Sequence, residues 1–501
     1  WTIVPKIPGT KTIDSKWVFR VKEDPVKGIQ KFKARLCARG FLQQRGIDYT
    51  ETFAPVVRYD SLRVFLAAVT EKDLELLQFD VQTAFLYGEL EEDIFMKVPE
   101  GLVVEGSKET EMVCKLNKSL YGLKQAPRCW NKKFLEILSQ FDLKCSQADQ
   151  CIFVGQVNGE TIYLALFVDD GLVAAETESA LNYITSKLRE AFKIKIGDSS
   201  YFVGMQIERN RKNKSLVIHQ TAYVEKILEK FGMREVKPVS VPIDPHITLY
   251  PVDENDEPLS IVPYREAIGS LVFLAAVSRP DIAFAVNSVS KFLNKHSAEH
   301  WRAVKRIFAY LKGTKDYGLE YKNGGSGIEL VGFSDADYAN DVETRRSTTG
   351  YIFCMVNGPV SWSSQRQKLV VLSTTESEYV AAATATKEAI WLRKLISDLG
   401  YSCERELILY VDNQSAIRLV NNPVFHKRTK HIDIRYHYIR EKFESNEIMV
   451  MYVSSEMQRA DILTKALPRD RFRKLCEIIN IASIQRKRSN GGSIEAVGLS
   501  R

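Results

Sequence analysis

Two adjacent carboxylates, Asp169 and Asp170, lie between two apolar runs in the segment 161–175. An Asp-Gly pair between β-prone runs is a strong hairpin signal, because glycine tolerates the positive φ that a tight turn needs. The sequence therefore predicts a hairpin with both carboxylates at its tip. Such close like charges repel each other, burial raises their pKa, and a divalent cation removes both costs. Carboxylates that share Mg²⁺ with substrate phosphates are the usual magnesium arrangement.

A third carboxylate, Asp80, ends another apolar run, 74–79. The segment Asp-Asp-Gly taken alone is explained more simply as a solvated turn. Phosphoryl transfer with two metal ions, however, needs a carboxylate cluster that holds the ions roughly 3.5–4 Å apart. Asp80, Asp169 and Asp170 are therefore candidates for one such cluster.

A second set of carboxylates lies in the C-terminal half of the chain. Asp335 follows the expected strand 328–334, and Glu378 lies early in the expected helix 376–399. Asp412 ends the expected strand 407–411, and Asp461 opens the run 460–465. Three of these positions are ends of elements, where sites of α/β sheets gather. Each residue alone is explained by a helix cap or a solvated side chain. Spacing leaves Glu376, Asp337 and Asp433 open as competing candidates.

Composition sets broad limits on the class of protein. A chain of 501 residues with 45% hydrophobic content is long enough for two to four domains with full cores. The net charge of +7 is compatible with a polyanionic partner, although many soluble proteins are equally basic. No run of about 18 uncharged apolar residues is present, so no membrane span is expected. The 8 cysteines form no Cys-x-x-Cys motif, which favours reduced thiols in a cytosolic protein.

The first residue is Trp1, with no methionine and no signal-peptide pattern before the first expected strand. We therefore expect the chain to be a fragment or a processed piece of a longer protein.

The sequence motifs around Asp169 and Asp170 resemble those of a known protein family. Phe167-Val168-Asp169-Asp170 is similar to the Tyr-x-Asp-Asp box of reverse transcriptases, with a phenylalanine that keeps the ring and loses the hydroxyl. Segments 81–88 and 120–128 resemble the copia-type LTR retrotransposon polymerase. The resemblance continues in unbroken order from residue 1 to about residue 470. It indicates the reverse transcriptase–RNase H portion of a copia-type Pol polyprotein, without Gag, protease or integrase.

This resemblance implies roles for residues near the first cluster. Lys31, Lys33 and Arg35 share one face of an expected strand, which spacing alone explains equally well as a solvated face. In the family, basic residues of this segment grip the incoming triphosphate, which implies that role for Lys33 and Arg35. Phe85 matches the aromatic that clashes with a ribose 2′-hydroxyl, although core packing is the simpler explanation. Gln125 matches a residue that lies against the nucleotide sugar and the template.

The resemblance extends to RNase H, whose four acidic residues bind two Mg²⁺ ions. The residues carried over are Asp335, Glu378, Asp412 and Asp461. Glu378 is preferred to Glu376 because its Glu-x-x-Ala register with Ala381 fits the family helix. Some RNases H have a histidine shortly before the last aspartate, but segment 453–459 has none. Proton transfer to the leaving group therefore needs another donor or water.

The expected fold class is α+β and α/β multidomain. It comprises a right-hand polymerase of fingers, palm and thumb, a connection region, and an RNase H-like mixed α/β domain. The expected boundaries are 1–236 for the polymerase, 237–325 for a Pro-rich linker and helical connection, 326–470 for RNase H, and 471–501 for a basic, flexible tail.

Several further elements are expected from periodicity and turn signals. They are a helix capped by Asp60 or Ser61, helices 131–141 and 179–192, a primer-grip hairpin 201–207, a thumb helix 221–231, an extended Pro-rich connection with an acidic stretch 253–257, and helices 264–293 and 300–311.

The function implied is an RNA-directed DNA polymerase that uses two-metal nucleotidyl transfer, with RNase H cleavage of the RNA strand of RNA–DNA hybrids. The cofactor is Mg²⁺, two ions per active site, with Mn²⁺ as an alternative. The implied partners are an RNA template, a DNA primer, RNA–DNA hybrid and dNTPs, with no membrane; in the element they include a Gag particle and integrase. The implied location is a cytoplasmic virus-like particle, with a later nuclear stage.

The competing interpretation is a decayed or co-opted element copy that only binds nucleic acid. Drift should have removed at least one of the seven carboxylates, and all seven are present, which favours an enzyme. A magnesium phosphatase or nuclease alone does not explain Phe85 or the segment 120–128.

Overall fold

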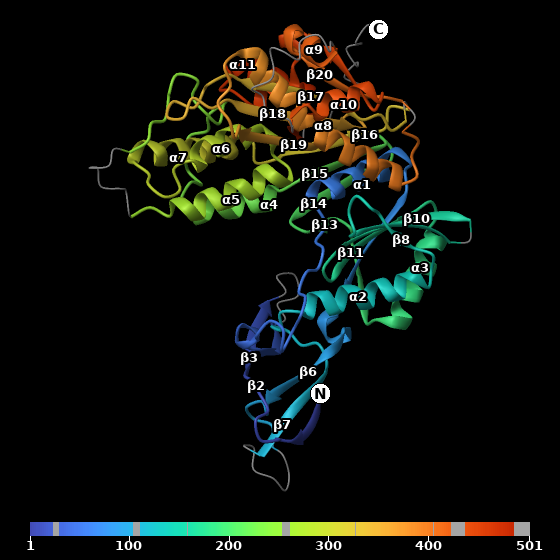
Figure 1. Cartoon of the computed structure of the whole chain (residues 1–501). Helices are drawn as coiled ribbons and strands as arrows, with labels where there is room; N and C mark the ends of the chain where they lie inside the picture. Colours follow the sequence, from blue (N-terminus) through green and yellow to red (C-terminus); the bar gives the residue numbers. More distant parts are fainter. Residues whose placement is uncertain are drawn as a thin grey trace. The chain divides into compact units, whose positions relative to one another are not determined.

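The computed structural model describes residues 1–23, 30–103, 111–157, 159–252, 261–325, 327–403, 405–421 and 436–484. These residues form two compact units (Figure 1). Unit 1 comprises residues 1–57, 76–146 and 150–197, and unit 2 comprises 58–75, 147–149 and the chain from 198 onward. These units group residues by contact and do not test family domains, so the boundaries at 236, 325 and 470 stay predictions.

Unit 1 contains a six-stranded sheet that joins distant parts of the chain. Its strands, in spatial order, are β12 (Ile194–Gly197), β5 (Glu75–Val81), β11 (Asp170–Ala175), β10 (Glu160–Phe167), β9 (Ile152–Val157) and β8 (Lys144–Cys145). Helices α2 (Ala126–Ser139) and α3 (Glu178–Ala191) share its core. Aromatic rings fill this core, with Trp130, Phe134 and Phe192 in mutual contact. The sheet therefore holds β5 and β11 as neighbours on a rigid base.

The remaining strands of unit 1 form a smaller sheet and a ribbon. The sheet has the order β1 (Thr2–Pro5), β7 (Met112–Lys118), β6 (Glu89–Lys97) and β2 (Thr12–Ile13). The ribbon pairs β3 (Ser15–Glu23) with β4 (Gln30–Ala38) in antiparallel register, with Arg35 opposite Val18. The ribbon leaves large apolar side chains exposed, including Phe19 and Phe32.

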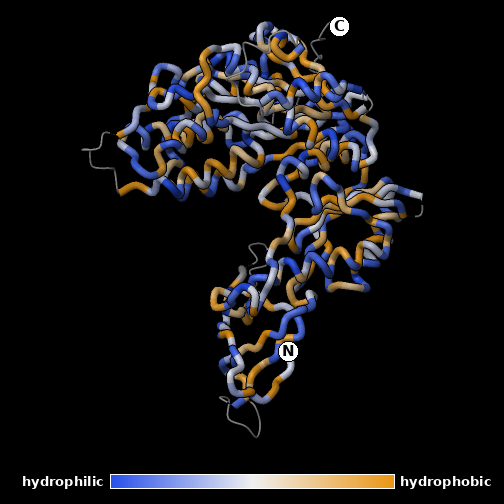
Figure 2. Tube along the Cα trace, in the orientation of Figure 1, coloured by the Kyte–Doolittle hydropathy of each residue, from blue (hydrophilic) through white to orange (hydrophobic). Residues whose placement is uncertain are grey.

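Unit 2 begins with a five-stranded sheet and four helices. The strand order is β13 (Tyr201–Phe202), β14 (Met205–Asn210), β15 (Ser215–His219), β16 (Tyr317–Lys322) and β22 (Ile481–Ser483). The helices are α4 (Thr221–Lys230), α5 (Tyr264–Val277), α6 (Ala283–Ser290) and α7 (Ala298–Gly313). Their apolar faces belong to one buried cluster. Hydrophobic and hydrophilic residues alternate along α4 and α7, as amphipathic helices require (Figure 2).

A mixed sheet forms the rest of unit 2. Its order is β19 (Gly358–Arg366), β18 (Thr348–Met355), β17 (Val331–Asp337), β20 (Leu407–Val411) and β21 (Ile448–Tyr452). Strand β17 is antiparallel to β18 but parallel to β20, and β20 is parallel to β21. Parallel neighbours need a crossover connection, and helix α8 (Thr374–Asp398) lies in the connection that returns to β20. Helices α9 (Gln414–Asn421), α10 (Tyr438–Glu444) and α11 (Arg469–Ile478) complete the unit. The mixed α/β multidomain class is therefore confirmed.

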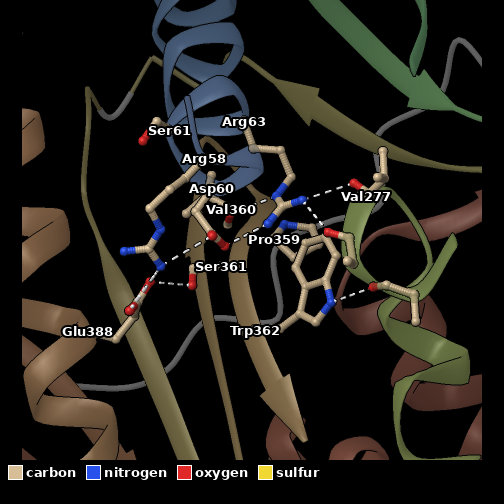
Figure 3. A network of polar contacts seen from close by, with 12 residues as sticks. Arg58, Asp60, Ser61, Arg63, Val277, Pro359, Val360, Ser361, Trp362 and Glu388 are labelled. Atoms are coloured by element: carbon tan, nitrogen blue, oxygen red, sulfur yellow. Dashed lines mark hydrogen bonds and ion pairs between the residues drawn. The ribbon is translucent and has the colours of Figure 1, made fainter. Parts of the chain in front are cut away.

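Helix α1 (Tyr59–Glu71) is built into unit 2 by two arginines (Figure 3). The buried Arg63 guanidinium donates to the carbonyls of Val360 at 2.7 Å and Val277 at 2.9 Å, and it lies 3.9 Å from the Trp362 ring centroid. A buried guanidinium is stable only when its donors are paired. Arg58 pairs with Glu388 at 3.2 Å.

The predicted cap of this helix by Asp60 or Ser61 is wrong. The N-cap is Arg58, which makes no side-chain cap bond. Asp60 instead accepts from Arg63 at 2.7 Å, and the Ser61 hydroxyl donates to Asp149 at 2.5 Å. Asp60 and Ser61 lie inside the first turn, because the helix already begins at Tyr59, and their oxygens bond Arg63 of the same helix and the distant Asp149.

Other predicted helices are confirmed with shifted ends. The predicted helix 131–141 begins at Ala126, because Pro127 suits the first turn, where no backbone donor is needed. The predicted helix 264–293 is divided into α5 and α6, because Pro280 cannot continue a helix and opens a 3₁₀ turn, Pro280–Ile282. Helix α7 begins at Ala298, where Ser297 and His300 form a capping box.

Three local predictions match the structure without such shifts. Helix α3 follows a Thr177 cap, the hairpin 201–207 is formed by β13 and β14, and helix α4 covers most of 221–231. In the Pro-rich stretch, residues 237–252 and 261–263 contain no helix or strand. The predicted flexible tail 471–501 is wrong for residues 471–484, because they contain most of helix α11 and strand β22, which pairs with β16. The acidic stretch 253–257 and the basic residues after 484 lie outside the described residues. None of the helices in the described ranges is long and apolar enough to cross a membrane.

Candidate active sites

The first three carboxylates come together in unit 1. Strands β10 and β11 pair with Phe167 opposite Asp170, which leaves Val168 and Asp169 as a two-residue turn. Strand β5, the neighbour of β11, carries Asp80. The Val81 amide donates to the Asp169 carbonyl at 2.8 Å, which ties the turn to β5. The charges of Asp169 and Asp80 both act on the Asp170 carboxyl group, so the three carboxyl groups lie close together.

The turn itself differs from the predicted one. The positive φ lies at Val168, at 58°, and Gly171 is already inside β11. A Cβ on Gly171 would come within 2.2 Å of the Phe79 ring, so glycine is needed here for close packing of β11 on β5. A β-branched residue at positive φ is strained. The Trp130 indole donates to the Val168 carbonyl at 2.6 Å and helps to hold this conformation.

Burial and mutual repulsion set the protonation of this cluster. Burial, together with the charges of Asp169 and Asp80, raises the pKa of Asp170 to about 6. Burial also raises the pKa of Asp169, although the charges of Arg35 and Lys33 oppose that rise. Clustered carboxylates that hold a proton so strongly are a suitable donor set for Mg²⁺ or Mn²⁺. The residues present therefore fit a divalent metal.

The aromatic side chains of Tyr121 and Phe85 and the cationic side chain of Arg35 lie next to these carboxylates. Arg35 donates a hydrogen bond to the Tyr121 hydroxyl, and its guanidinium lies 5.6 Å from the Tyr121 ring centroid. The half-buried Phe85 ring meets Tyr121 edge to face at 5.2 Å. Burial raises the pKa of Tyr121, and the charges of Asp169 and Asp80 add to the rise, so the phenol lies within their field. Tyr121 belongs to the segment 120–128 that resembles the family, but the resemblance assigned it no role of its own.

Gln125, from the same segment, has a different environment. Its carboxamide is buried and donates to the Asp48 carbonyl at 2.9 Å and to Glu92 at 3.2 Å. Its oxygen accepts from Gln43 at 3.0 Å. Both ends of the carboxamide are therefore used to fix the segment 120–128 to residues 43–48.

The second set of carboxylates comes together in unit 2. Oxygen atoms of Asp335, Asp412 and Asp461 all lie within 4.8 Å of one another. Asp335 lies inside β17, which begins and ends three residues later than the predicted strand 328–334, and Asp412 directly follows β20. The parallel pairing of β17 with β20 brings these residues to the same edge. Asp461 comes from the 3₁₀ helix Arg459–Leu463.

Glu378 is the fourth member of this cluster. It lies early in α8 and accepts a hydrogen bond from the Ala336 amide, next to Asp335. Its buried Oε2 has no hydrogen-bond partner within the described residues. Burial and the charges of Asp335 and Asp412 raise the pKa of Glu378 well above its ordinary value. A buried carboxylate oxygen without a donor fits a cation site.

The competing candidates have other environments. The Glu376 carboxylate accepts the Leu372 amide at 2.9 Å, as part of the start of α8. Asp337 lies two residues beyond Asp335 on β17, where burial raises its pKa and the charge of Lys465 lowers it. Asp433 lies outside the described residues. The structure therefore brings Glu378, and not Glu376, close to Asp335 and Asp412.

Two basic residues that the sequence analysis did not single out contact this cluster. Lys465 Nζ lies 2.9 Å from Asp461 Oδ1 and 3.5 Å from Asp335 Oδ2. Arg471 lies 3.2 Å from Asp461 Oδ2. Burial raises the pKa of Asp335 to about 7, although the nearby ammonium of Lys465 opposes that rise. The position of Lys465, four residues after Asp461, was the available signal.

Known proteins of retrotransposons are similar in sequence to the parts of the chain that carry the two clusters. Residues 1–245, which include the first cluster, match the family model described as reverse transcriptase (RNA-dependent DNA polymerase). Over 483 residues the chain is 42% identical to the retrovirus-related Pol polyprotein from transposon TNT 1-94 of Nicotiana tabacum, covering 95% of this chain and 36% of that protein. A putative transposon Ty5-1 protein of Saccharomyces cerevisiae is 30% identical over 313 residues, with 62% of this chain and 99% of that protein covered. The chain belongs to the copia-type retrotransposon Pol polyprotein family.

A second Pol polyprotein extends this family match across the second cluster. The protein from transposon RE1 of Arabidopsis thaliana is 38% identical over 488 residues, which is 97% of this chain and 33% of that protein. The chain thus spans about a third of the length of these two Pol polyproteins. The predicted family resemblance is confirmed, and the chain carries a reverse transcriptase domain.

Proposed function

We propose that this chain is an RNA-directed DNA polymerase that copies retrotransposon RNA into DNA, with RNase H cleavage of the RNA strand of hybrids. The observation that carries the proposal is the convergence of Asp80, Asp169 and Asp170 within the region that matches the reverse transcriptase family. The presence of the second cluster, in the part covered by the Pol polyproteins, supports the hydrolytic activity.

In the first site, the three carboxylates would hold two Mg²⁺ ions, or Mn²⁺. When bound, such ions supply activation of the primer 3′-hydroxyl and neutralise charge on the triphosphate. The protein contributes placement and fixed charge. Lys33 and Arg35 bind the triphosphate, and the hydrogen bond from Arg35 to Tyr121 orients that guanidinium. Phe85, supported by Tyr121, excludes a 2′-hydroxyl beneath the sugar.

The assignment of Gln125 follows from its fixed position. Its carboxamide is held by Gln43 and Asp48, and the next residues begin α2. We assign it to the nucleotide and template side of the site, where it fixes the segment that carries Tyr121.

The architecture is consistent with a right-hand polymerase. We assign the ribbon β3–β4 and the small sheet to fingers, the six-stranded sheet with α2 and α3 to the palm, the β13–β14 hairpin to a primer grip, and α4 to the thumb. The mixed sheet with α8 is assigned to an RNase H-like domain.

In the second site, Asp335, Glu378, Asp412 and Asp461 would hold two divalent ions that activate a water against an RNA phosphodiester. The substrate is the RNA strand of a hybrid, because recognition requires 2′-hydroxyl groups. Equal cleavage of a DNA duplex would contradict this assignment. Family membership also suggests a Gag particle and integrase as partners and a cytoplasmic particle as the location.

The test of the polymerase assignment is primer extension on an RNA template with Mg²⁺ and dNTPs. The Asp170→Asn variant should lose extension but still bind primer–template. Retained extension in Asp170→Asn and Asp169→Asn would contradict the assignment. Binding without extension in the unsubstituted chain would favour a nucleic-acid-binding role instead.

A further inference from the structure

Lys465 has an unusual place among the basic residues of unit 2. Its ammonium lies within 4 Å of two members of the second carboxylate cluster, Asp461 and Asp335. Arg471 contacts only Asp461 in that cluster, and its other bonds go to the carbonyls of Ser455 and Glu456. Arg471 therefore fixes the 3₁₀ segment that carries Asp461, whereas Lys465 bridges two separate elements.

We propose that Lys465 is an internal counter-ion that takes the place of a divalent cation in the second cluster and must be displaced when the ion binds. This inference rests on the proposed function in one respect, namely that the cluster binds divalent ions.

Charge balance supports the displacement. The second cluster has four carboxylates, and two divalent ions would bring four positive charges. An ammonium between Asp335 and Asp461 adds a fifth charge, which would repel ions held by the same oxygens. Without ions, the same ammonium relieves the repulsion between the carboxylates. The two cations therefore compete for one pair of ligands.

The structure also provides a destination for the displaced side chain. The Lys465 side chain is 36% exposed, so it is not locked in the core. It also lines a cavity of about 540 Å³, together with Asn340, Lys295 and Asp337. A lysine has a long, flexible stem with a point charge at its end. Rotation of that stem can carry the ammonium from the carboxylates into the cavity without a change in the backbone.

The test measures metal affinity in the full chain. A background with Asp169→Asn and Asp170→Asn removes the first cluster, and free Mn²⁺ is followed by electron paramagnetic resonance during titration. Lys465→Met should tighten Mn²⁺ binding roughly threefold to tenfold, the size expected for removal of one partly exposed ion-pair partner. Lys465→Arg keeps the charge and should stay near the background affinity.

The matched control is Lys474→Met. Lys474 is also half-exposed and paired with a carboxylate, Glu456 at 3.8 Å, but it touches no member of the cluster. Its substitution should leave Mn²⁺ affinity unchanged. In EDTA, Lys465→Met should unfold at a lower temperature than the background, and saturating Mn²⁺ should close that gap. If Lys465→Met does not fold by circular dichroism, Lys465→Gln carries the same test.

The outcomes separate this inference from the function on which it rests. A Mn²⁺ site that is lost on Asp461→Asn but is no tighter in Lys465→Met overturns the inference alone. Failure to find any such site overturns the proposed function of the cluster together with the inference.

Discussion

The two carboxylate clusters differ in how repulsion among their negative charges is relieved. In the first cluster, burial and the charges of Asp169 and Asp80 raise the pKa of Asp170 to about 6, and the charges of Lys33 and Arg35 reach Asp169 from another strand. In the second, lysine and arginine make direct ion pairs with Asp335 and Asp461. Repulsion among clustered carboxylates can therefore be relieved by a proton on one of them or by a neighbouring cationic side chain, and the two arrangements differ in how a metal ion can enter.

The largest expected effect is on hybrid cleavage and comes from substitution of Glu378, the fourth member of the second cluster. Glu378→Gln should lower hybrid cleavage by roughly 10²-fold or more, because a metal ligand supplies several kcal/mol of charge stabilisation. Extension of a primer should not change, because the first cluster is intact. The measurement is cleavage of a labelled RNA strand under single-turnover conditions.

Glu376→Gln is the matched control for this prediction. Glu376 accepts the Leu372 amide at the start of α8, so its loss should cost only about 1 kcal/mol of stability. Loss of cleavage in Glu376→Gln with normal cleavage in Glu378→Gln would reverse the assignment.

A smaller effect is expected at the sugar side of the first cluster. Phe85→Ala removes the ring that meets Tyr121 edge to face. Incorporation of ribonucleotides relative to deoxynucleotides should rise by roughly 10- to 100-fold, the range for removal of a steric contact. The measurement is single-nucleotide incorporation with dNTP and rNTP. Unchanged sugar selectivity would leave Phe85 with a core-packing role only.

The smallest expected effect is a pH dependence of the folding stability, caused by the proton that Asp170 holds when no metal ion is bound. The pKa of Asp170 is raised to about 6, so the folded state keeps a proton that the unfolded chain releases near pH 4. Without metal, this contribution to stability is present below about pH 4 and is lost as the pH rises through about 6.

Urea unfolding in EDTA between pH 4 and pH 7.5 measures this contribution. The difference between the unsubstituted chain and Asp170→Asn should change in that window, and Mg²⁺ affinity of the first cluster should rise with pH. A difference that is constant with pH would show that Asp170 holds no extra proton.

Sequence reasoning predicted the clusters better than their surroundings. Asp80, Asp169 and Asp170 end or follow apolar runs, and this pattern is visible in the sequence alone. The need for Gly171 could not be predicted, because it depends on the Phe79 ring of a neighbouring strand. The turn conformation at Val168 likewise depends on an indole from α2.

Residues that act across elements were missed for a related reason. Tyr121 reaches the first cluster only because its segment folds against β4, and Lys465 bridges Asp461 to a strand more than a hundred residues earlier. Helix α1 was predicted correctly, but its cap was not, because the helix begins at Tyr59 and Asp60 and Ser61 are bonded to Arg63 and Asp149 inside its first turn. The contacts of Ser61 with Asp149 and of Lys465 with Asp335 join residues far apart in the sequence and are set by tertiary packing, whereas the pairs Asp60–Arg63 and Asp461–Lys465 have helical spacing that the sequence does show.

The most direct test of the central claim is one reaction with two readouts. A labelled RNA template with an annealed DNA primer, Mg²⁺ and dNTPs reports extension and RNA cleavage together. We predict that Asp170→Asn abolishes extension but still cleaves a preformed hybrid, and that Asp335→Asn abolishes cleavage but still extends. Loss of both activities in either variant, or of neither, would contradict the account of two separate carboxylate sites.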